Sequence, residues 1–181
     1  MAHNLQPTLD DTRTNATFEE LMWALSRPGQ PRELPAEGFW PLAESLLDRE
    51  CSFHVADNPS LDLKMAATGA RRMPLADADY IFATIGSAES VEALSRLRIG
   101  SLLYPDDAAT LFAPAHFGSG QQLRLTGPGI KDSVTVSVEG IDPAFWQMRA
   151  KVIRYPLGWD LYLIDGKRLL GIPRSTKIEV L

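Results

Sequence analysis

A short segment near the C-terminus places three groups that can bind an anion at consecutive positions. Arg174, Ser175 and Thr176 follow Pro173 directly, where an apolar run ends. A guanidinium and two hydroxyls at the end of a strand can donate hydrogen bonds to the oxygens of a phosphate or phosphonate. A solvated surface segment is the alternative interpretation, and the residue types are compatible with both.

A second candidate, Arg149, lies within a predicted helix. Phe145, Met148 and Val152 stand four and one positions before it and three positions after it, so its guanidinium should lie beside a mainly apolar face. Buried charges are seldom left unpaired. We therefore expect Arg149 to be shielded from solvent and to engage either backbone carbonyls or a carboxylate, with Asp160 as the candidate. The functional alternative is a bidentate contact with an anion or a partner protein.

Two further features could contact an anion but have simpler interpretations. Arg27 follows a predicted helix, where its charge would complement the helix dipole. The Gly127-Pro128-Gly129 turn could offer backbone N–H groups, but Pro128 lacks one and no Lys-Ser/Thr pair follows. We keep Arg27 as a candidate contact and interpret the glycine-rich segment as a turn between two strands.

The residues that bind metals and cofactors are sparse. The chain has one cysteine, Cys51, and three histidines, His3, His54 and His116, with no pair at ligand spacing. No lysine lies in a setting typical of a Schiff base. We therefore expect no metal and no pyridoxal phosphate in this chain.

Composition indicates one ordinary globular domain. The 181 residues are 45% hydrophobic and 23% charged, with a formal net charge of −5. Residues 121–181 are nevertheless net positive, with 9 Lys and Arg against 6 Asp and Glu. This balance favours a small anion over nucleic acid as a ligand. Without a signal or membrane-length apolar segment, we expect a cytoplasmic protein with a mobile tail over 1–14 and one domain over 15–181.

Helical and strand patterns alternate along the chain, which favours a single α/β domain with a mixed sheet and flanking helices. A capping box at Thr17 and Glu20 predicts that the first helix begins there and ends near Arg27. The remaining predictions are helices over 41–49, 87–98 and 142–154; strands over 51–56, 79–84 and 110–113; a loop over 114–120; an antiparallel pair over 123–125 and 134–138; and two strands within 155–176.

Four segments, in this order and at these intervals, resemble the PhnH family, a core subunit of bacterial carbon–phosphorus lyase. They are MWALSRPG (22–29), TGPGI (126–130), FWQMR (145–149) and YPLGWDLYLIDGKRLLGIPRST (155–176). The resemblance implies a fold like the large domain of fold-type I pyridoxal-phosphate transferases, without that cofactor. It also implies a homodimer when isolated, association with other core subunits, and a part in the ATP-dependent formation of ribose 1-alkylphosphonate 5-triphosphate.

Two other functions remain open on the residues alone. One is a stand-alone enzyme that acts on a small anionic substrate at a cleft formed by Arg149, Asp160 and Arg174. The other is a purely architectural subunit whose surfaces hold its partners. Neither contradicts the composition.

Overall fold

A computed structural model describes residues 6–181, within which five helices and ten strands form. The helices are α1 (Leu9–Ser26), α2 (Trp40–Leu46), α3 (Pro59–Ala66), α4 (Ala88–Leu94) and α5 (Ala144–Val152). The strands are β1 (Arg32–Glu33), β2 (Ser52–Val55), β3 (Arg71–Arg72), β4 (Tyr80–Phe82), β5 (Thr110–Pro114), β6 (His116–Thr126), β7 (Val134–Glu139), β8 (Asp160–Asp165), β9 (Arg168–Ile172) and β10 (Lys177–Val180). The mixed α/β class expected from the alternating patterns is confirmed.

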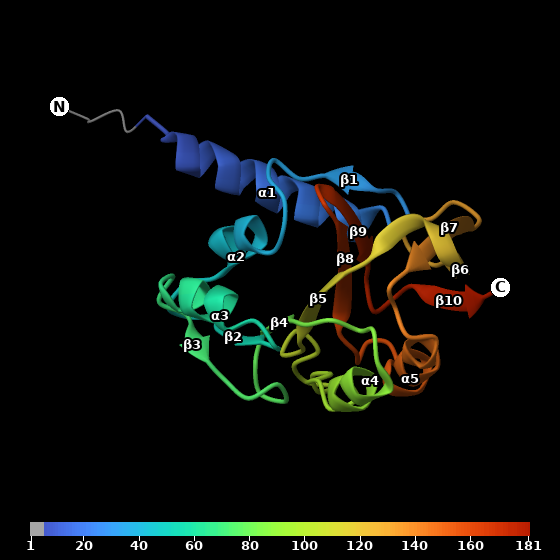
Figure 1. Ribbon diagram of the computed structural model, residues 1–181. Coiled ribbons are helices and arrows are strands. Elements are labelled where there is room, and N and C mark those ends of the chain that lie inside the picture. Colours follow the sequence, from blue (N-terminus) through green and yellow to red (C-terminus); the bar gives the residue numbers. More distant parts are fainter. Residues whose placement is uncertain (1–5) are drawn as a thin grey trace.

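The strands form two sheets. Seven of them follow the order β1-β9-β8-β5-β4-β2-β3, in which β3, β2, β4, β5 and β8 are parallel and β9 and β1 are antiparallel to their neighbours. The other three form an antiparallel sheet in the order β10-β6-β7. Figure 1 shows α1, α2 and α3 on one side of the large sheet, and α4 and α5 on the other.

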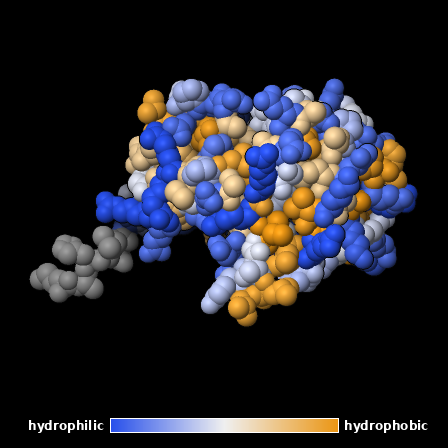
Figure 2. Space-filling view, turned by 90° about the horizontal axis from the view of Figure 1, so that it is seen from below, coloured by the Kyte–Doolittle hydropathy of each residue, from blue (hydrophilic) through white to orange (hydrophobic). Residues whose placement is uncertain are grey.

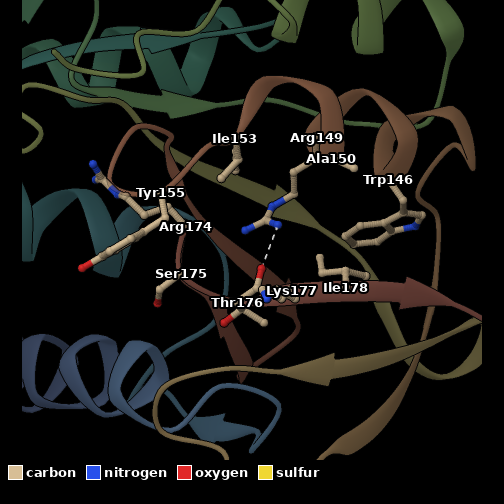
Figure 3. Close-up of a pocket in the computed structure, with 10 residues that line it drawn as sticks. All are labelled: Trp146, Arg149, Ala150, Ile153, Tyr155, Arg174, Ser175, Thr176, Lys177 and Ile178. Carbon is tan, nitrogen blue, oxygen red and sulfur yellow. Dashed lines mark hydrogen bonds between the residues drawn. The ribbon is translucent and has the colours of Figure 1, made fainter. Parts of the chain in front are cut away.

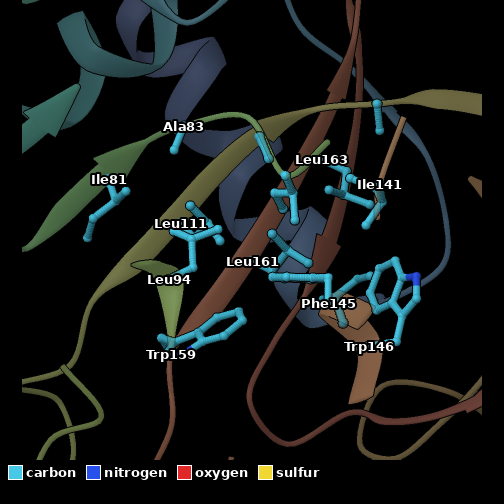
Figure 4. Packing of buried hydrophobic residues seen from close by; sticks show 14 of the residues in the cluster. Ile81, Ala83, Leu94, Leu111, Ile141, Phe145, Trp146, Trp159, Leu161 and Leu163 are labelled. Atoms are coloured by element: carbon cyan, nitrogen blue, oxygen red, sulfur yellow. The ribbon is translucent and has the colours of Figure 1, made fainter. Parts of the chain in front are cut away.

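Both faces of the large sheet are buried, so its central strands are apolar on both sides. Ile81, Leu111 and Leu161 belong to the cluster that packs against α4, α5 and the small sheet. Figure 4 shows Phe145 and Trp159 among the side chains of this cluster, and their ring centroids are 5.7 Å apart. The start of β8 and helix α5 are therefore fixed against each other through the core.

The opposite face carries a row of stacked aromatic rings. Phe82, Phe112 and Tyr162 occupy paired positions on three neighbouring parallel strands, with ring centroids 4.9 and 5.0 Å apart. Helix α1 contacts the Tyr162 end of this row, where the Tyr162 hydroxyl donates a hydrogen bond to the carbonyl of Leu21. Offset aromatic contacts of this kind add to the stabilisation from burial alone.

The glycine-rich segment is the turn between β6 and β7, as predicted, and it also fills a tight space. A Cβ on Gly127 would lie 2.9 Å from the carbonyl oxygen of Ser175, and one on Gly129 would lie 2.3 Å from that of Ser26. Gly129 has a φ of +82°, which L side chains adopt only with strain. The turn therefore packs closely against both the end of α1 and the segment that connects β9 with β10.

The first helix begins earlier than the capping box at Thr17 predicted. Thr8 caps α1, because its hydroxyl accepts from the N–H of Asp11 at 3.1 Å and the Asp11 carboxylate accepts from the N–H of Thr8 at 2.8 Å. Thr17 lies inside the helix, where its hydroxyl donates to the carbonyl of Arg13 at 3.0 Å. Residues 9–14, which were expected to belong to a tail over 1–14, form the first turns of α1. Residues 1–5 of that tail lie outside the described residues.

Other boundaries also differ. Residues 116–120, predicted as loop, belong to β6, which pairs with β7 through a register shift between Phe117 and Gln121. Helix α4 ends at Leu94 rather than at residue 98. Helix α3 and the short strands β1, β3 and β10 were not predicted. Within residues 6–181, no helix is both long and apolar enough to cross a membrane.

Candidate functional site

Arg149 lies in the core with only 4% of its surface exposed. Just before α5, the carboxylate of Asp142 accepts a hydrogen bond from the N–H of Ala144 at 2.9 Å. Phe145 and Trp146, one turn before Arg149 on the helix, are buried as well. The guanidinium of Arg149 donates to the carbonyl of Pro173 at 3.0 Å and to that of Thr176 at 3.4 Å. Of the two expected kinds of partner, backbone carbonyls are the ones found.

The two carbonyls belong to one tight turn between β9 and β10. The N–H of Thr176 also donates to the carbonyl of Pro173 at 2.9 Å, which closes the turn over residues 173–176. Arg149 therefore contacts both ends of the turn. The face of the Trp159 ring also lies 5.7 Å from the guanidinium carbon, within the range of a cation–π contact.

Asp160 pairs with Arg174 rather than with Arg149. Its carboxylate accepts from Nε of Arg174 at 3.2 Å, from Nη2 at 2.9 Å and from the backbone N–H of Arg174 at 2.8 Å. The remaining terminal nitrogen of Arg174 donates to the carbonyl of Pro105. Asp160 opens β8 and Arg174 follows β9, so the antiparallel pairing of these strands brings the two together.

A cavity of about 310 Å³ lies between α5 and the β9–β10 turn. Figure 3 shows Arg149 reaching down from α5, with Tyr155, Arg174 and Ser175 on one side of it and Trp146 and Ile178 on the other. The lining residues are Trp146, Arg149, Ala150, Ile153, Tyr155, Arg174, Ser175, Thr176, Lys177 and Ile178.

The charge in this cavity is positive. Its lining includes three cationic residues, Arg149, Arg174 and Lys177, and no carboxylate. Burial lowers the pKa of Arg149 to about 10, although the charge of Asp160 acts in the opposite direction. At neutral pH the guanidinium is still protonated. The cavity therefore holds a buried cation whose hydrogen-bond acceptors are neutral carbonyls.

A second cavity, of about 470 Å³, lies on the other side of the Asp160–Arg174 pair and has the opposite character. Its lining includes four carboxylates, those of Glu50, Asp79, Asp106 and Asp160. Within residues 6–181, no group of three or more His, Cys, Asp or Glu side chains is arranged to hold a metal ion. The ion pair thus separates a basic cavity from an acidic one.

The structure brings together most of the residues that the sequence singled out. Arg149, Arg174, Ser175 and Thr176 line the basic cavity, and Asp160 lies beside it through its pairing with Arg174. Arg27 does not line the cavity. It forms the C-cap of α1, is exposed, and its guanidinium carbon lies 5.5 Å from the ring centroid of Trp23.

Sequence reasoning missed three lining residues with polar or aromatic groups. Trp146 could have been found from its place three residues before Arg149, which puts both on one helix face. Lys177 could have been found from its position directly after the Arg-Ser-Thr segment. Tyr155 stands 73% exposed at the same cavity, and nothing in its local sequence indicated a site.

Comparison with known proteins decides the family. The model of the family described as "Bacterial phosphonate metabolism protein (PhnH)" matches residues 8–179. The chain belongs to the PhnH family. The resemblance of the four sequence segments to this family is thereby confirmed.

Two curated proteins are similar to this chain. A protein of Stutzerimonas stutzeri, whose name is given as "Putative C-P lyase subunit protein HtxG", is 34% identical over 93% of this chain and 87% of its own length. The alpha-D-ribose 1-methylphosphonate 5-triphosphate synthase subunit PhnH of Rhizobium meliloti is 31% identical over 54% of this chain and 50% of its own length.

Proposed function

We propose that this chain is a subunit of a carbon–phosphorus lyase core complex. In that complex it supports the ATP-dependent formation of a ribose 1-alkylphosphonate 5-triphosphate during phosphonate catabolism. The observation that supports this most is the extent of the likeness to the relative named HtxG, 34% identity over 93% of the chain and 87% of the relative. The PhnH family model matches nearly the same span.

Within such a complex we assign the chain a structural or substrate-assisting role rather than catalysis on its own. The one carboxylate beside the two arginines, Asp160, already accepts three hydrogen bonds from Arg174. Such a carboxylate is poorly placed to act as a general base, because taking up a proton would break its pairing with the guanidinium. No histidine lines the basic cavity.

The family also supports proposals on fold and cofactor. We infer a likeness to the large domain of fold-type I pyridoxal-phosphate transferases, and we propose that this chain holds neither that cofactor nor a metal. A stoichiometric metal in elemental analysis of the purified chain, or an absorption band from bound cofactor, would contradict the second proposal.

We further propose that the chain forms a homodimer when isolated, binds other core subunits in the complex, and works in the cytoplasm. Figure 2 shows hydrophobic residues exposed among charged ones on the face seen from the side of α4 and α5. Among the exposed large hydrophobic residues are Leu102, Leu103 and Tyr155. Apolar surface of this kind supports contact with another protein.

The proposal is tested in a bacterium that lacks its own PhnH subunit and is grown on methylphosphonate as the sole phosphorus source. Expression of this chain should restore growth, and a tagged copy should purify together with the other core subunits. A failure of both, with the chain folded and expressed, would overturn the proposed function.

The competing hypothesis of a stand-alone enzyme has one observation in its favour, the presence of Arg149 and Arg174 in a single cavity. It predicts turnover when the purified chain alone is mixed with ATP and methylphosphonate. We expect no turnover without the other subunits. ³¹P nuclear magnetic resonance of the mixture distinguishes the two.

A further inference from the structure

The small sheet has an open edge along β7. This strand pairs with β6 on one side, and within residues 6–181 no strand pairs with its other side. In an antiparallel pair, every second residue directs its N–H and C=O groups away from the partner strand. Outside the ladder with β6, no backbone–backbone hydrogen bond of the described residues involves residues 134–139. The outer edge of β7 therefore carries free backbone donors and acceptors.

The other sheet edges are protected in ways that β7 is not. The outer strands of the large sheet, β1 and β3, have two residues each, and all four residues are charged. The other edge of the small sheet, β10, carries Lys177 and Glu179. Shortness and charge both keep an edge from pairing with another chain. β7 has six residues, and its first five, VTVSV, include no charge and no proline.

The core is also incomplete beside β7. Val134 and Val136 are the register partners of Leu125 and Leu123 on β6, and all four side chains pack in the same apolar cluster. The two leucines are fully buried, whereas the two valines are only half-buried. β6 has a neighbouring strand on both sides and β7 on one side only, which accounts for the difference. An added strand would cover the remaining apolar surface of the valines.

This edge defines the chemistry of a strand that fits it. Thr135 and Ser137 alternate with the valines, so the added strand must be polar on one face and apolar on the other. It must lack proline where it pairs, because proline has no N–H to donate. Lys131 precedes β7 and Glu139 ends it, so an acidic residue near one end of the added strand and a basic residue near the other would complement them.

The length of β7 favours a different subunit over a second copy of this chain. Six residues of strand span about 20 Å. Pairing over that length alone falls short of the about 1,200–2,000 Å² that stable interfaces bury. Two copies joined only through β7 would therefore not stay together. A subunit that is also held by other surfaces of a complex needs the strand only to fix its position and register.

We propose that β7 binds an extended segment of another subunit, which joins the small sheet as a fourth strand. Backbone hydrogen bonds along β7 provide the attachment, and the alternation of valine with threonine and serine sets the register. The inference rests on the proposed function, because the core complex supplies the partner subunits. It adds to that function a specific surface and a mode of contact.

Residue-resolved hydrogen exchange tests the pairing. The exchange of the β7 amides is measured in the chain alone and in the complex that co-purifies with it. Amides that donate to β6 should be protected in both samples. The alternate amides, which point outward, should exchange at least about tenfold more slowly in the complex only. Protection of every second residue distinguishes strand pairing from a contact that merely covers β7.

Val136→Lys is the sharpest variant. At an open edge the lysine can reach solvent, but an added strand would bury its charge. The other subunits that a tagged chain retains should therefore decrease at least about tenfold. Val136→Thr keeps the branched shape without the charge and should retain them. Gln122→Lys adds the same charge to β6, opposite Ser137 and one strand inward from the edge, and should assemble like the wild type. Melting curves show whether each variant is folded.

Each outcome decides the proposal. Equal exchange of the outward amides in both samples, or normal assembly of folded Val136→Lys, overturns it and leaves the subunit role intact. Failure of the wild type to co-purify with any core subunit overturns the proposed function and this inference with it. If the outward amides are already protected in the isolated chain and lose that protection on dilution, a second copy occupies the edge and the proposal is wrong. If Val136→Lys does not fold, the exchange of the wild type decides alone.

Discussion

Two charged residues of this chain have strong local partners of different kinds. Arg149 is held by neutral carbonyls, whereas Asp79, directly before β4, is held by donors on two sides. Ser52 donates its N–H and its hydroxyl to Asp79 at 2.7 and 2.6 Å, and Arg98 donates to the other carboxylate oxygen. Asp79 is therefore paired with a charged partner, whereas Arg149 is held by neutral groups.

Asp79 should give the protein a stability that depends on pH. Burial alone would raise the pKa of Asp79, but the hydrogen bonds from Ser52 and the charge of Arg98 outweigh it and hold the pKa below the usual 3.8. A carboxylate with a lowered pKa stabilises the fold above the unfolded-state value of 3.8, and this stability is lost as pH falls through the folded-state pKa.

We therefore expect Asp79→Asn to lower the free energy of unfolding by about 1–2 kcal/mol at pH 7, with a smaller difference from wild type at pH 3. Urea unfolding at the two pH values measures both. Asp106→Asn is the matched control, since Asp106 lines the same acidic cavity but is exposed. An equal loss at both pH values would contradict the role assigned to the charge of Asp79.

At the scale of elements, the strands and helices with a regular hydrophobic pattern were predicted. Elements too short to show such a pattern were not. The alternation in residues 123–125 and 134–138 predicted the β6–β7 pair, and the apolar runs within 155–176 became β8 and β9. By contrast, β1 and β3 have two residues each, too few for any period to show. Their strand conformation follows from pairing with β9 and β2.

The same distinction explains what could be predicted of the site. The helical spacing around Arg149 was sufficient to predict its burial, because that depends on one helix. Its acceptors in residues 173 and 176 lie 24 and 27 positions away, and only the packing of α5 against the β9–β10 turn selects them. The pairing of Asp160 with Arg174 also depends on tertiary structure, because the register of β8 and β9 decides which side chains lie next to each other.

The turn between β6 and β7 offers a prediction at this scale. Gly129→Ala would place a Cβ 2.3 Å from the Ser26 carbonyl and add strain at φ +82°. Both effects together should cost about 2–3 kcal/mol, which is a fall of roughly 4–12 °C in melting temperature. Calorimetric or fluorescence melting measures this change.

Gly38→Ala serves as the control for backbone strain alone. Gly38 has the same φ of +82°, but a Cβ there would meet nothing within 4 Å. Its cost should be about 1 kcal/mol. Equal losses at the two glycines would show that the close approach of the β6–β7 turn to α1 contributes nothing.

For the whole molecule, the exposed hydrophobic residues near the basic cavity are the best candidates for a subunit contact. Leu102 and Leu103 are 78% and 84% exposed on the segment between α4 and β5. That segment adjoins the cavity, because Pro105 accepts a hydrogen bond from Arg174.

We predict that the wild type forms a dimer of twice the 20.0 kDa chain mass, and that the double variant Leu102→Ser with Leu103→Ser is a monomer. Light scattering at micromolar concentration measures this. Leu63→Ser changes an exposed leucine on α3, across the large sheet, and should leave the dimer intact. If substitutions of Phe18 and Met22 on α1 dissociate the dimer instead, the contact lies on that helix and this prediction fails.

The placement of the tryptophans gives the chain a built-in optical reporter. Of its four tryptophans, Trp146 and Trp159 are buried, and both adjoin Arg149, one by lining the same cavity and the other by facing the guanidinium. Indole emission depends on nearby charge and on contact with water. The ultraviolet fluorescence of the unlabelled protein should therefore respond when the surroundings of this arginine change, without any dye attached to the chain.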